Sequence, residues 1–376
     1  MKICVVSPIF TLAGVPLAQL RFATALAAAG CHVDLLIGKV VEGRMLPTIP
    51  GVNVTVLQRP NVRSMFLPLC AYLRQARPEI VFSAEDHLNV VVLLAALVVR
   101  SKAKVSGSSR VTPFDTYSDV LFTKRWILKQ LARAVMRRAD ALTCVSEDMV
   151  TQYRTVFRDT PHVCVYNIVK TNSSASRMAE PVEDPWLSGD RPPLVIAAGR
   201  LAPWKGFADL IRAMKLVTAR RQARLIILGD GPLRQDLQKL IHSEGLQDCV
   251  RLLGYVDNPL KYFARADVFA LSSHVEGLPN VLVEAMLCGC TPVATDCPTG
   301  PREVLQGGKY GFLVPLRDPS GLAEGILQAL DYPVASHLLQ EAVRPFEEAT
   351  VITRHFEILN MPLRPANSPK QERDTA

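Results

Sequence analysis

Glu276-Gly-Leu-Pro-Asn-Val-Leu-Val-Glu284 places two carboxylates eight residues apart around the expected start of a helix. Proline suits the first turn of a helix, because the amide proton that it lacks is one that a helix leaves unpaired. The pattern therefore predicts a helix that begins near Asn280, with Glu276 in the preceding loop and Glu284 one turn inside. The free amides of this first turn attract a diphosphate, beside which Glu284 can accept hydrogen bonds from ribose hydroxyls. An ordinary capped helix is the alternative that this stretch alone leaves open.

Short β-branched runs alternate with helix-length segments on both sides of this stretch, which is typical of strand-helix-strand units and parallel sheets. The chain has 376 residues, which exceeds the length at which a single hydrophobic core usually stops growing, so two domains are expected. The expected strands are 2–6, 32–37, 80–82, 103–105, 141–145 and 163–165 in a first set, and 194–198, 224–228, 250–253, 268–271 and 291–294 in a second. The sequence predicts an N-terminal domain at 1–169, a linker at 170–193, a second domain at 194–345, a helix at 346–361 that returns to the first domain, and a disordered tail at 362–376.

The composition limits the classes of protein to which the chain can belong. Nine cysteines are scattered singly, without the spacing of a metal site, so we expect reduced core residues in a cytosol. The most apolar run, 88–99, is too short to span a bilayer, and the first residues lack the pattern of a signal peptide. A net charge of +8 favours anionic partners without choosing among nucleic acid, lipid and phosphorylated substrates.

In open parallel sheets ligands bind beyond the carboxyl ends of the strands, so the loops that follow strands hold the candidate site residues. Gly199-Arg-Leu-Ala-Pro-Trp-Lys-Gly206 follows the first strand of the second set and offers Arg200 and Lys205. Two such cations can bind one diphosphate and stabilise its charge as it departs, although solvated surface cations are the alternative. Gly229-Asp-Gly-Pro232 follows the next strand and predicts a tight turn that allows close backbone approach.

The loop after the very first strand contains Gly14, which can admit a phosphate at the start of a helix predicted at 16–29. This loop is not GxGxxG, and no acidic residue follows at the position that a dinucleotide ribose needs. An NAD site is therefore disfavoured.

Together these motifs resemble those of retaining glycosyltransferases of the GT-B type, in the large Glu-x7-Glu group (glycosyltransferase family 4, glycosyl transferases group 1). The resemblance covers most of the chain and extends to Leu253-Gly-Tyr-Val256, Pro301-Arg-Glu-Val304 and Gly311-Phe-Leu-Val314. It implies an α/β fold with two Rossmann-like domains facing across a cleft. It also implies a hexosyltransferase that retains anomeric configuration. The sequence lacks the Asp-x-Asp motif of metal-dependent transferases, so we expect that the reaction needs neither a metal nor a cofactor.

The resemblance implies roles for the matching residues. Glu276, Arg200 and Lys205 would act in catalysis, Glu276 on the transferred sugar and the two cations on the diphosphate. With Gly14 included, the donor-binding residues would be Gly14, Arg200, Lys205, Gly229, Gly254, Tyr255, Val256, Glu276, Leu278, Pro279, Asn280, Val281 and Glu284. Relatives often have a histidine after the fourth strand of the first domain, where this chain reads Val105-Ser-Gly-Ser-Ser-Arg110. The candidate acceptor-side residues are therefore His87, Asn89 and Arg110, each of which a structural role would also explain.

The implied reaction moves a hexose or N-acetylhexosamine from a nucleotide sugar, with UDP expected, to a glycan or lipid-linked acceptor. Cell-surface polysaccharide or lipopolysaccharide synthesis is the expected process, without nucleic acid as a partner. The alternatives are a sugar-nucleotide epimerase or phosphorylase on the same fold, or a non-catalytic scaffold that binds nucleotide sugars or membranes.

One helical segment suggests contact with a membrane. It carries a cationic stripe, Arg125, Lys129, Arg133 and Arg137, and an apolar stripe, Ile127, Leu131 and Val135. Such a helix can rest on an anionic membrane, and the lipid-linked acceptors of many relatives favour that interpretation, whereas a solvated outer face is the equal alternative. We therefore expect a cytoplasmic protein in peripheral contact with the inner face of a membrane.

Overall fold

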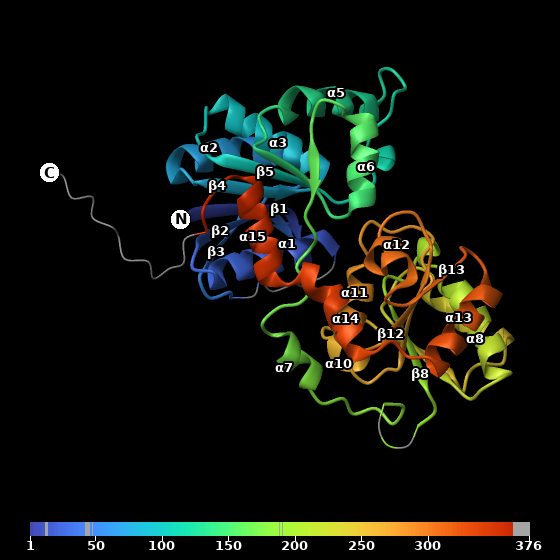
Figure 1. Ribbon diagram of the computed structural model, residues 1–376. Helices are drawn as coiled ribbons and strands as arrows, with labels where there is room; N and C mark the ends of the chain where they lie inside the picture. The colour runs from blue at the N-terminus through green and yellow to red at the C-terminus, as the bar shows by residue number, and fades with distance from the viewer. Residues whose placement is uncertain (12–13, 42–45, 47, 188, 190, 364–376) are drawn as a thin grey trace. The chain divides into compact units, whose positions relative to one another are not determined.

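The computed structural model describes residues 1–11, 14–41, 46, 48–187, 189 and 191–363, and the chain forms two compact units (Figure 1). Unit 1 consists of Met1–Ile168 and the chain from Glu348 on, and unit 2 consists of Val169–Glu347. Each unit contains one parallel sheet flanked by helices.

Unit 1 is built on a seven-stranded sheet in the order β3-β2-β1-β4-β5-β6-β7. Its strands are β1 (Lys2–Phe10), β2 (His32–Val40), β3 (Val52–Val56), β4 (Ile80–Ala84), β5 (Lys104–Ser109), β6 (Ala141–Cys144) and β7 (His162–Cys164). Its helices are α1 (Gly14–Ala28), η1 (Val62–Met65), α2 (Phe66–Ala76), α3 (Asp86–Val98), α4 (Pro113–Thr116), α5 (Lys124–Met136), α6 (Glu147–Val156) and α15 (Glu348–Ile358). Central strands such as β4 are wholly buried, as expected where helices cover both faces of a parallel sheet.

The C-terminal helix α15 completes the core of unit 1. It packs against α1, and Val351, Ile352 and Phe356 join the apolar side chains of β1, β2 and β4 in one buried cluster. The chain therefore returns to its first unit after it has formed its second.

Unit 2 has a six-stranded sheet in the order β10-β9-β8-β11-β12-β13. Its strands are β8 (Leu194–Ala198), β9 (Arg224–Leu228), β10 (Val250–Gly254), β11 (Val268–Leu271), β12 (Thr291–Thr295) and β13 (Phe312–Val314). Its helices are α7 (Ser174–Ala179), η2 (Pro203–Lys205), α8 (Phe207–Thr218), α9 (Arg234–Ser243), α10 (Leu260–Phe263), α11 (Asn280–Leu287), α12 (Pro301–Val304), η3 (Gln306–Gly308), α13 (Pro319–Asp331), α14 (Ser336–Val343) and η4 (Arg344–Phe346).

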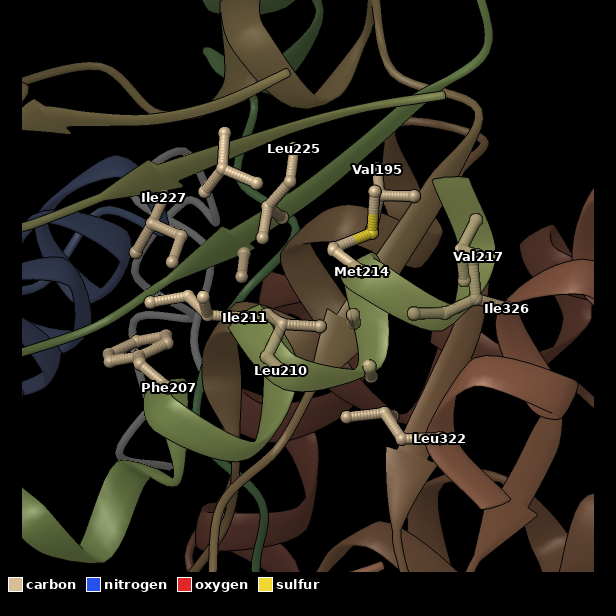
Figure 2. Packing of buried hydrophobic residues seen from close by; sticks show 14 of the residues in the cluster. Val195, Phe207, Leu210, Ile211, Met214, Val217, Leu225, Ile227, Leu322 and Ile326 are labelled. Atoms are coloured by element: carbon tan, nitrogen blue, oxygen red, sulfur yellow. The ribbon is translucent and has the colours of Figure 1, made fainter. Parts of the chain in front are cut away.

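Helix α8 supplies much of the core of unit 2. Its buried residues recur at the spacing of one helix face and include Phe207, Leu210 and Met214. They pack with side chains of β8 and β9, such as Val195 and Leu225, and with those of α13 (Figure 2). This packing fixes the start of α8, and with it the preceding loop, against the carboxyl end of β8.

The predicted architecture of two Rossmann-like domains is confirmed. Numbered within its own unit, each sheet has the strand order 3-2-1-4-5-6, extended by one strand in unit 1. All of the strands predicted from sequence are present, whereas β3 and β13 were not predicted. β3 alternates between half-buried and exposed residues at the edge of its sheet, and β13 is only three residues long, so neither has a strong apolar run.

The segment predicted as a linker, 170–193, has ordered structure in its described part. Helix α7 packs against α10, and Trp186 lies against the guanidinium groups of Arg224 and Arg251, at 5.0 and 4.5 Å from its ring centroid. These contacts attach the segment to unit 2. Of the tail predicted to be disordered, residues 364–376 lie outside the described residues.

Candidate functional site

The strand order of unit 2 brings two of the motif loops together. β8 and β11 are neighbours at the point where the strand order reverses, which is where ligands bind in open parallel sheets. The loop after β8 carries Arg200 and Lys205, and the loop after β11 carries Glu276. Two motifs that are 71 residues apart in the sequence therefore meet at one edge of the sheet.

Lys205 and Glu276 form an ion pair at this edge. Nζ of Lys205 lies 2.5 Å from Oε1 of Glu276, which also accepts a hydrogen bond from Oγ of Ser273 at 2.6 Å. The two charged side chains are 17% and 10% exposed, so they are shielded from most solvent but not sealed from it. A ligand entering here meets an ammonium and a carboxylate side by side, which suits a molecule that carries both phosphate oxygens and hydroxyl groups.

Two glycines allow the loops of this site to approach closely. Gly206 has a φ of 64°, and a Cβ atom there would lie 1.9 Å from the carbonyl oxygen of Ser272 in the loop after β11. A Cβ atom on Gly229, after β9, would lie 1.9 Å from the carbonyl oxygen of Gly199. The backbones of the loops after β9, β8 and β11, which are neighbouring strands of the sheet, are therefore in contact. Only glycine permits this approach at these two positions.

Helix α11 begins at Asn280, which confirms the predicted start, and Pro279 is its N-cap residue. The loop after β12 supports this start, because Thr299 donates a hydrogen bond to the carbonyl oxygen of Glu276. Glu284 lies within α11 and is 5% exposed. The start of α11 thus lies next to the loop that carries Glu276, but its first amides are not all free as predicted. The amide of Asn280 donates to the carbonyl oxygen of Leu278, and that of Leu282 donates to the carbonyl oxygen of Pro279, each at 2.9 Å, because the turn before the helix supplies these acceptors.

The other predicted donor-binding residues occupy the same edge of unit 2, with one exception. Arg200 is exposed, and its side chain has no hydrogen bond or ion pair with any residue that the structure describes. Gly254 ends β10, and the Tyr255 that follows it is 47% exposed. The exception is Gly14, which belongs to unit 1, where it opens α1 with a φ of 59°. The carboxyl edge of unit 2 therefore gathers Arg200, Lys205, Gly229, Gly254, Tyr255, Val256, Glu276, Leu278, Pro279, Asn280 and Val281, with Glu284 inside α11.

Sequence reasoning missed Ser273, His274 and Thr299. Nε2 of His274 lies 2.8 Å from Oδ2 of Asp209 in α8, and the backbone N–H of His274 donates to the carbonyl oxygen of Trp204 at 2.8 Å. His274 therefore ties the loop after β11 to the loop after β8. A signal was available, since Ser272-Ser-His is a polar run directly after a buried strand.

The cysteine nearest to this site is not a nucleophile at neutral pH. Cys297 follows β12 and is 3% exposed. Burial, assisted by the charge of Glu276, raises the pKa of the Cys297 thiol to about 12, so the thiol stays protonated.

In unit 1, His87 and Asn89 have very different surroundings on α3. The His87 side chain is 52% exposed, and its Nε2 lies 3.2 Å from Oε2 of Glu85, whose hydrogen bond raises the pKa of His87. Asn89 is 1% exposed; its side chain accepts a hydrogen bond from Oγ of Ser83 at 2.7 Å and donates one to the carbonyl oxygen of Ser108 at 3.0 Å. Asn89 therefore joins α3 to β4 and β5 through bonds that occupy its amide.

Arg110 follows β5 and points into the interior of unit 1, where it donates a hydrogen bond to Oδ1 of Asn167. With Gln19 and His355 it lines a cavity of about 20 Å³, which has room for about one water molecule. Burial lowers the pKa of Arg110 to about 10, so it remains a cation at neutral pH.

The buried and exposed faces of helix α5 differ from the two stripes predicted for it. Lys129 is only 5% exposed and pairs with Asp119, so it is not part of a cationic surface, and that part of the prediction is wrong. Ile127 and Leu131 are 47% and 50% exposed. The reason is that Ala132, Val135 and Met136 form the buried face of α5, and Lys129 lies on the same face one turn earlier. Arg125, Arg133 and Arg137 are exposed as predicted. No described helix has the length and apolar composition needed to span a membrane.

Comparison with known proteins agrees with the fold and the motifs. Residues 192–332 match the family described as Glycosyl transferases group 1, and residues 13–167 match the Glycosyl transferase 4-like domain. The chain belongs to the GT-B glycosyltransferases of this group 1, family 4 type.

Three glycosyltransferases are similar to parts of this chain. The uncharacterized glycosyltransferase MJ1059 of Methanocaldococcus jannaschii is 32% identical over 264 residues, 64% of this chain and 64% of that protein. The N-acetylgalactosamine-N,N'-diacetylbacillosaminyl-diphospho-undecaprenol 4-alpha-N-acetylgalactosaminyltransferase of Campylobacter jejuni is 28% identical over 245 residues, 65% of this chain and 64% of that protein. The lipopolysaccharide core biosynthesis glycosyltransferase LpsE of Rhizobium meliloti is 35% identical over 148 residues, 39% of this chain and 41% of that protein. The chain thus matches less than two thirds of the length of each of these relatives.

A solved structure shows the same fold over almost the whole chain. Anabaena HepE in complex with UDP-glucose superimposes with a TM-score of 0.74, at 21% identity, over 96% of this chain and 99% of that one.

Proposed function

We propose that the protein is a retaining glycosyltransferase that moves a hexose or N-acetylhexosamine from a UDP-sugar to a glycan or lipid-linked acceptor. The observation that carries the proposal is the ion pair of Lys205 and Glu276 at the switch point of unit 2. Arg200 and the start of α11 lie at the same edge, so cations and the positive end of a helix dipole adjoin a carboxylate for sugar hydroxyls.

In this proposal each group has a defined task. Arg200 and Lys205 bind the diphosphate next to the positive end of the α11 dipole, Glu276 accepts hydrogen bonds from the transferred sugar, and Glu284 accepts them from the ribose. The transition state resembles an oxocarbenium ion, and the growing negative charge lies on the leaving diphosphate. Lys205 is already held near this position, so little reorganisation is needed when the charge develops.

The bond changes need no protein nucleophile. The bond between the anomeric carbon and the diphosphate oxygen breaks, and the acceptor oxygen bonds to the same face of the sugar. The acceptor proton passes to the departing phosphate oxygen, which accounts for retention without a covalent enzyme intermediate. Because protein cations neutralise the diphosphate, we expect activity to survive EDTA. Loss of activity that magnesium or manganese restores would contradict this part of the proposal.

The relatives support the substrate classes by likeness. The Campylobacter jejuni relative is named for transfer of N-acetylgalactosamine to a diphospho-undecaprenol-linked sugar, LpsE is named for lipopolysaccharide core synthesis, and the HepE structure contains UDP-glucose. We extend these classes to the present chain and place its reaction in cell-surface polysaccharide or lipopolysaccharide synthesis, in the cytoplasm. Exposed Arg125, Arg133 and Arg137 support peripheral contact with the inner face of a membrane.

A panel of UDP- and GDP-sugars tests the donor site. We expect a UDP-sugar to raise the melting temperature and to release UDP when an acceptor glycan is added. Glu284→Ala should remove this thermal shift, whereas Glu324→Ala, on the exposed face of α13, should leave it unchanged. Absence of a shift with every nucleotide sugar would reject the donor site. A shift without nucleotide release would favour a scaffold, and an isomerised nucleotide sugar would favour an epimerase.

A further inference from the structure

The segment before α5 presents an apolar tip on the surface of unit 1. Val120, Leu121 and Phe122 are consecutive in the sequence and are 66%, 63% and 82% exposed. Phe122 has a φ of 61°, in the left-handed region, and its ring lies 5.6 Å from the ring of Trp126 between centroids. Three adjacent large apolar side chains at this exposure leave a contiguous patch in water, and such patches mark interaction sites.

The exposed apolar surface continues from this tip onto the outer face of α5, where Ile127 and Leu131 are half exposed. Four exposed cations accompany it, Lys124, Arg125, Arg133 and Arg137. The acidic residues of the segment are Asp115 and Asp119, and Asp119 is already paired with Lys129. We call this region the α5 surface: Val120, Leu121, Phe122, Lys124, Arg125, Ile127, Leu131, Arg133 and Arg137.

We propose that the α5 surface docks on an anionic lipid bilayer, with residues 120–122 inserted among the headgroups. The apolar tip gains by leaving water, and the cations that surround it gain from the negative surface potential. A second copy of the chain fits less well, because two α5 surfaces brought face to face would oppose cation to cation. The inference deepens the membrane contact of the proposed function and rests on it, but it replaces the two predicted stripes of α5 by an apolar tip with basic residues around it.

Sedimentation of the full chain with vesicles tests the docking. We expect binding to vesicles of phosphatidylcholine and phosphatidylglycerol at low salt, and little binding to phosphatidylcholine alone. The double variant Leu121→Ser, Phe122→Ser should lose at least about tenfold in vesicle affinity, because the inserted apolar area is lost. Leu67→Ser is the matched control, since Leu67 is 73% exposed on α2 and lies outside the α5 surface.

Trp126 provides a second readout that reports insertion directly. Next to Phe122 it should enter a less polar environment, so vesicles should shift the tryptophan emission to shorter wavelength, and brominated lipid should quench it. Trp126→Phe should remove the shift. The Arg133→Glu and Arg137→Glu variants should each weaken binding by about fivefold or more, and added salt should do the same to the parent chain.

Several results would overturn the proposal. Failure of the parent chain to sediment with anionic vesicles at low salt would do so. So would binding by the Leu121→Ser, Phe122→Ser variant equal to that of the parent, or a Trp126 emission that does not change on binding. A concentration-dependent dimer that the same double variant abolishes would instead assign the α5 surface to self-association. Vesicle binding is measured without donor or acceptor, and the thermal shift with UDP-sugars is measured without vesicles. Failure of the docking and failure of the sugar-nucleotide site therefore give different results.

Discussion

The carboxyl edges of the two sheets have the same topology but use their polar groups differently. In unit 2, Lys205 and Glu276 lie on loops and bond to each other while staying partly exposed. In unit 1, Asp86 is 2% exposed and accepts hydrogen bonds from Ser109 and Tyr153. Asn89 is likewise held by Ser83 and Ser108. A partly exposed ion pair can exchange one partner for a ligand, whereas a buried and satisfied network holds its loop rigid.

This contrast teaches that the shared strand order fixes where a site can form but not which unit performs chemistry. The Rossmann-like order gives each unit a switch point, at β1 and β4 in unit 1 and at β8 and β11 in unit 2. Only the residues that follow the strands, on loops in unit 2 and at the start of α3 in unit 1, distinguish the two edges. The variants below test that distinction, from the largest expected effect to the smallest.

Lys205→Ala should cause the largest effect, a fall in turnover of about 100-fold to 1000-fold, because it removes a preorganised cation from the leaving diphosphate. The measurement is nucleotide release at saturating UDP-sugar. Lys215→Ala is the control, since Lys215 is an exposed cation of unit 2 that pairs with Glu244. A loss below about tenfold for Lys205→Ala, at unchanged melting temperature, would remove the functional asymmetry between the two edges.

The strands and the order of the motif loops could be predicted from sequence, because buried parallel strands are continuous apolar runs and the motifs follow them directly. The rotation of α5 could not be predicted. Its pattern offered two stripes, and only the position of Asp119, in a loop before the helix, allows Lys129 to be buried. The same holds for Ser273 and Thr299, whose contacts with Glu276 depend on how the loop after β11 folds and where the loop after β12 meets it. Likewise, sequence marked Asn89 as a polar residue after a strand but did not show that Ser83 and Ser108 occupy its amide.

Asn89→Ala should lower the free energy of unfolding by about 1 to 3 kcal/mol, because it leaves the buried Ser108 carbonyl and Ser83 hydroxyl without this partner. Urea denaturation measures the change, and the thermal shift with UDP-sugar should keep its size. Asn53→Ala on β3, whose hydrogen bond to Asp34 is exposed, is the matched control and should cost less. A variant with parent-like stability but lost transfer would instead make Asn89 an acceptor-binding residue.

Unit 1 should also be the acid-sensitive unit. Burial, with the nearby charge of Arg110, lowers the pKa of His355 to about 3, and burial lowers the pKa of His162 to about 4. In the unfolded chain a histidine has a pKa of about 6.5, so the unfolded state binds more protons between these values. Stability therefore falls as the pH falls below about 6.5, by up to about 1.4 kcal/mol per pH unit for each histidine.

His355→Gln should reduce this pH dependence, measured as the urea midpoint at a series of pH values below neutrality. Above about pH 6.5 the variant and the parent should change in parallel, which provides the internal control. Equal slopes in the acid range would show that burial of His355 does not govern the acid sensitivity of unit 1.

The smallest effect should come from His87→Gln, and its size decides whether unit 1 takes part in proton transfer. General acid or base catalysis contributes about 100-fold or more, and we expect a smaller loss here. The hydrogen bond that His87 donates to the Glu85 carboxylate raises the pKa of His87 and so favours the imidazolium, which cannot accept a proton. If His87 were nevertheless the base, activity in the parent would rise with pH through that raised pKa, and the variant would lose this rise.

The backbone of Glu85, the partner of His87, is strained. Its φ of 80° is unfavourable for a residue with a side chain, and such strain often accompanies function. A loss above about 100-fold, together with loss of the acid limb of kcat/KM, would move the proton-transfer step to the edge of unit 1.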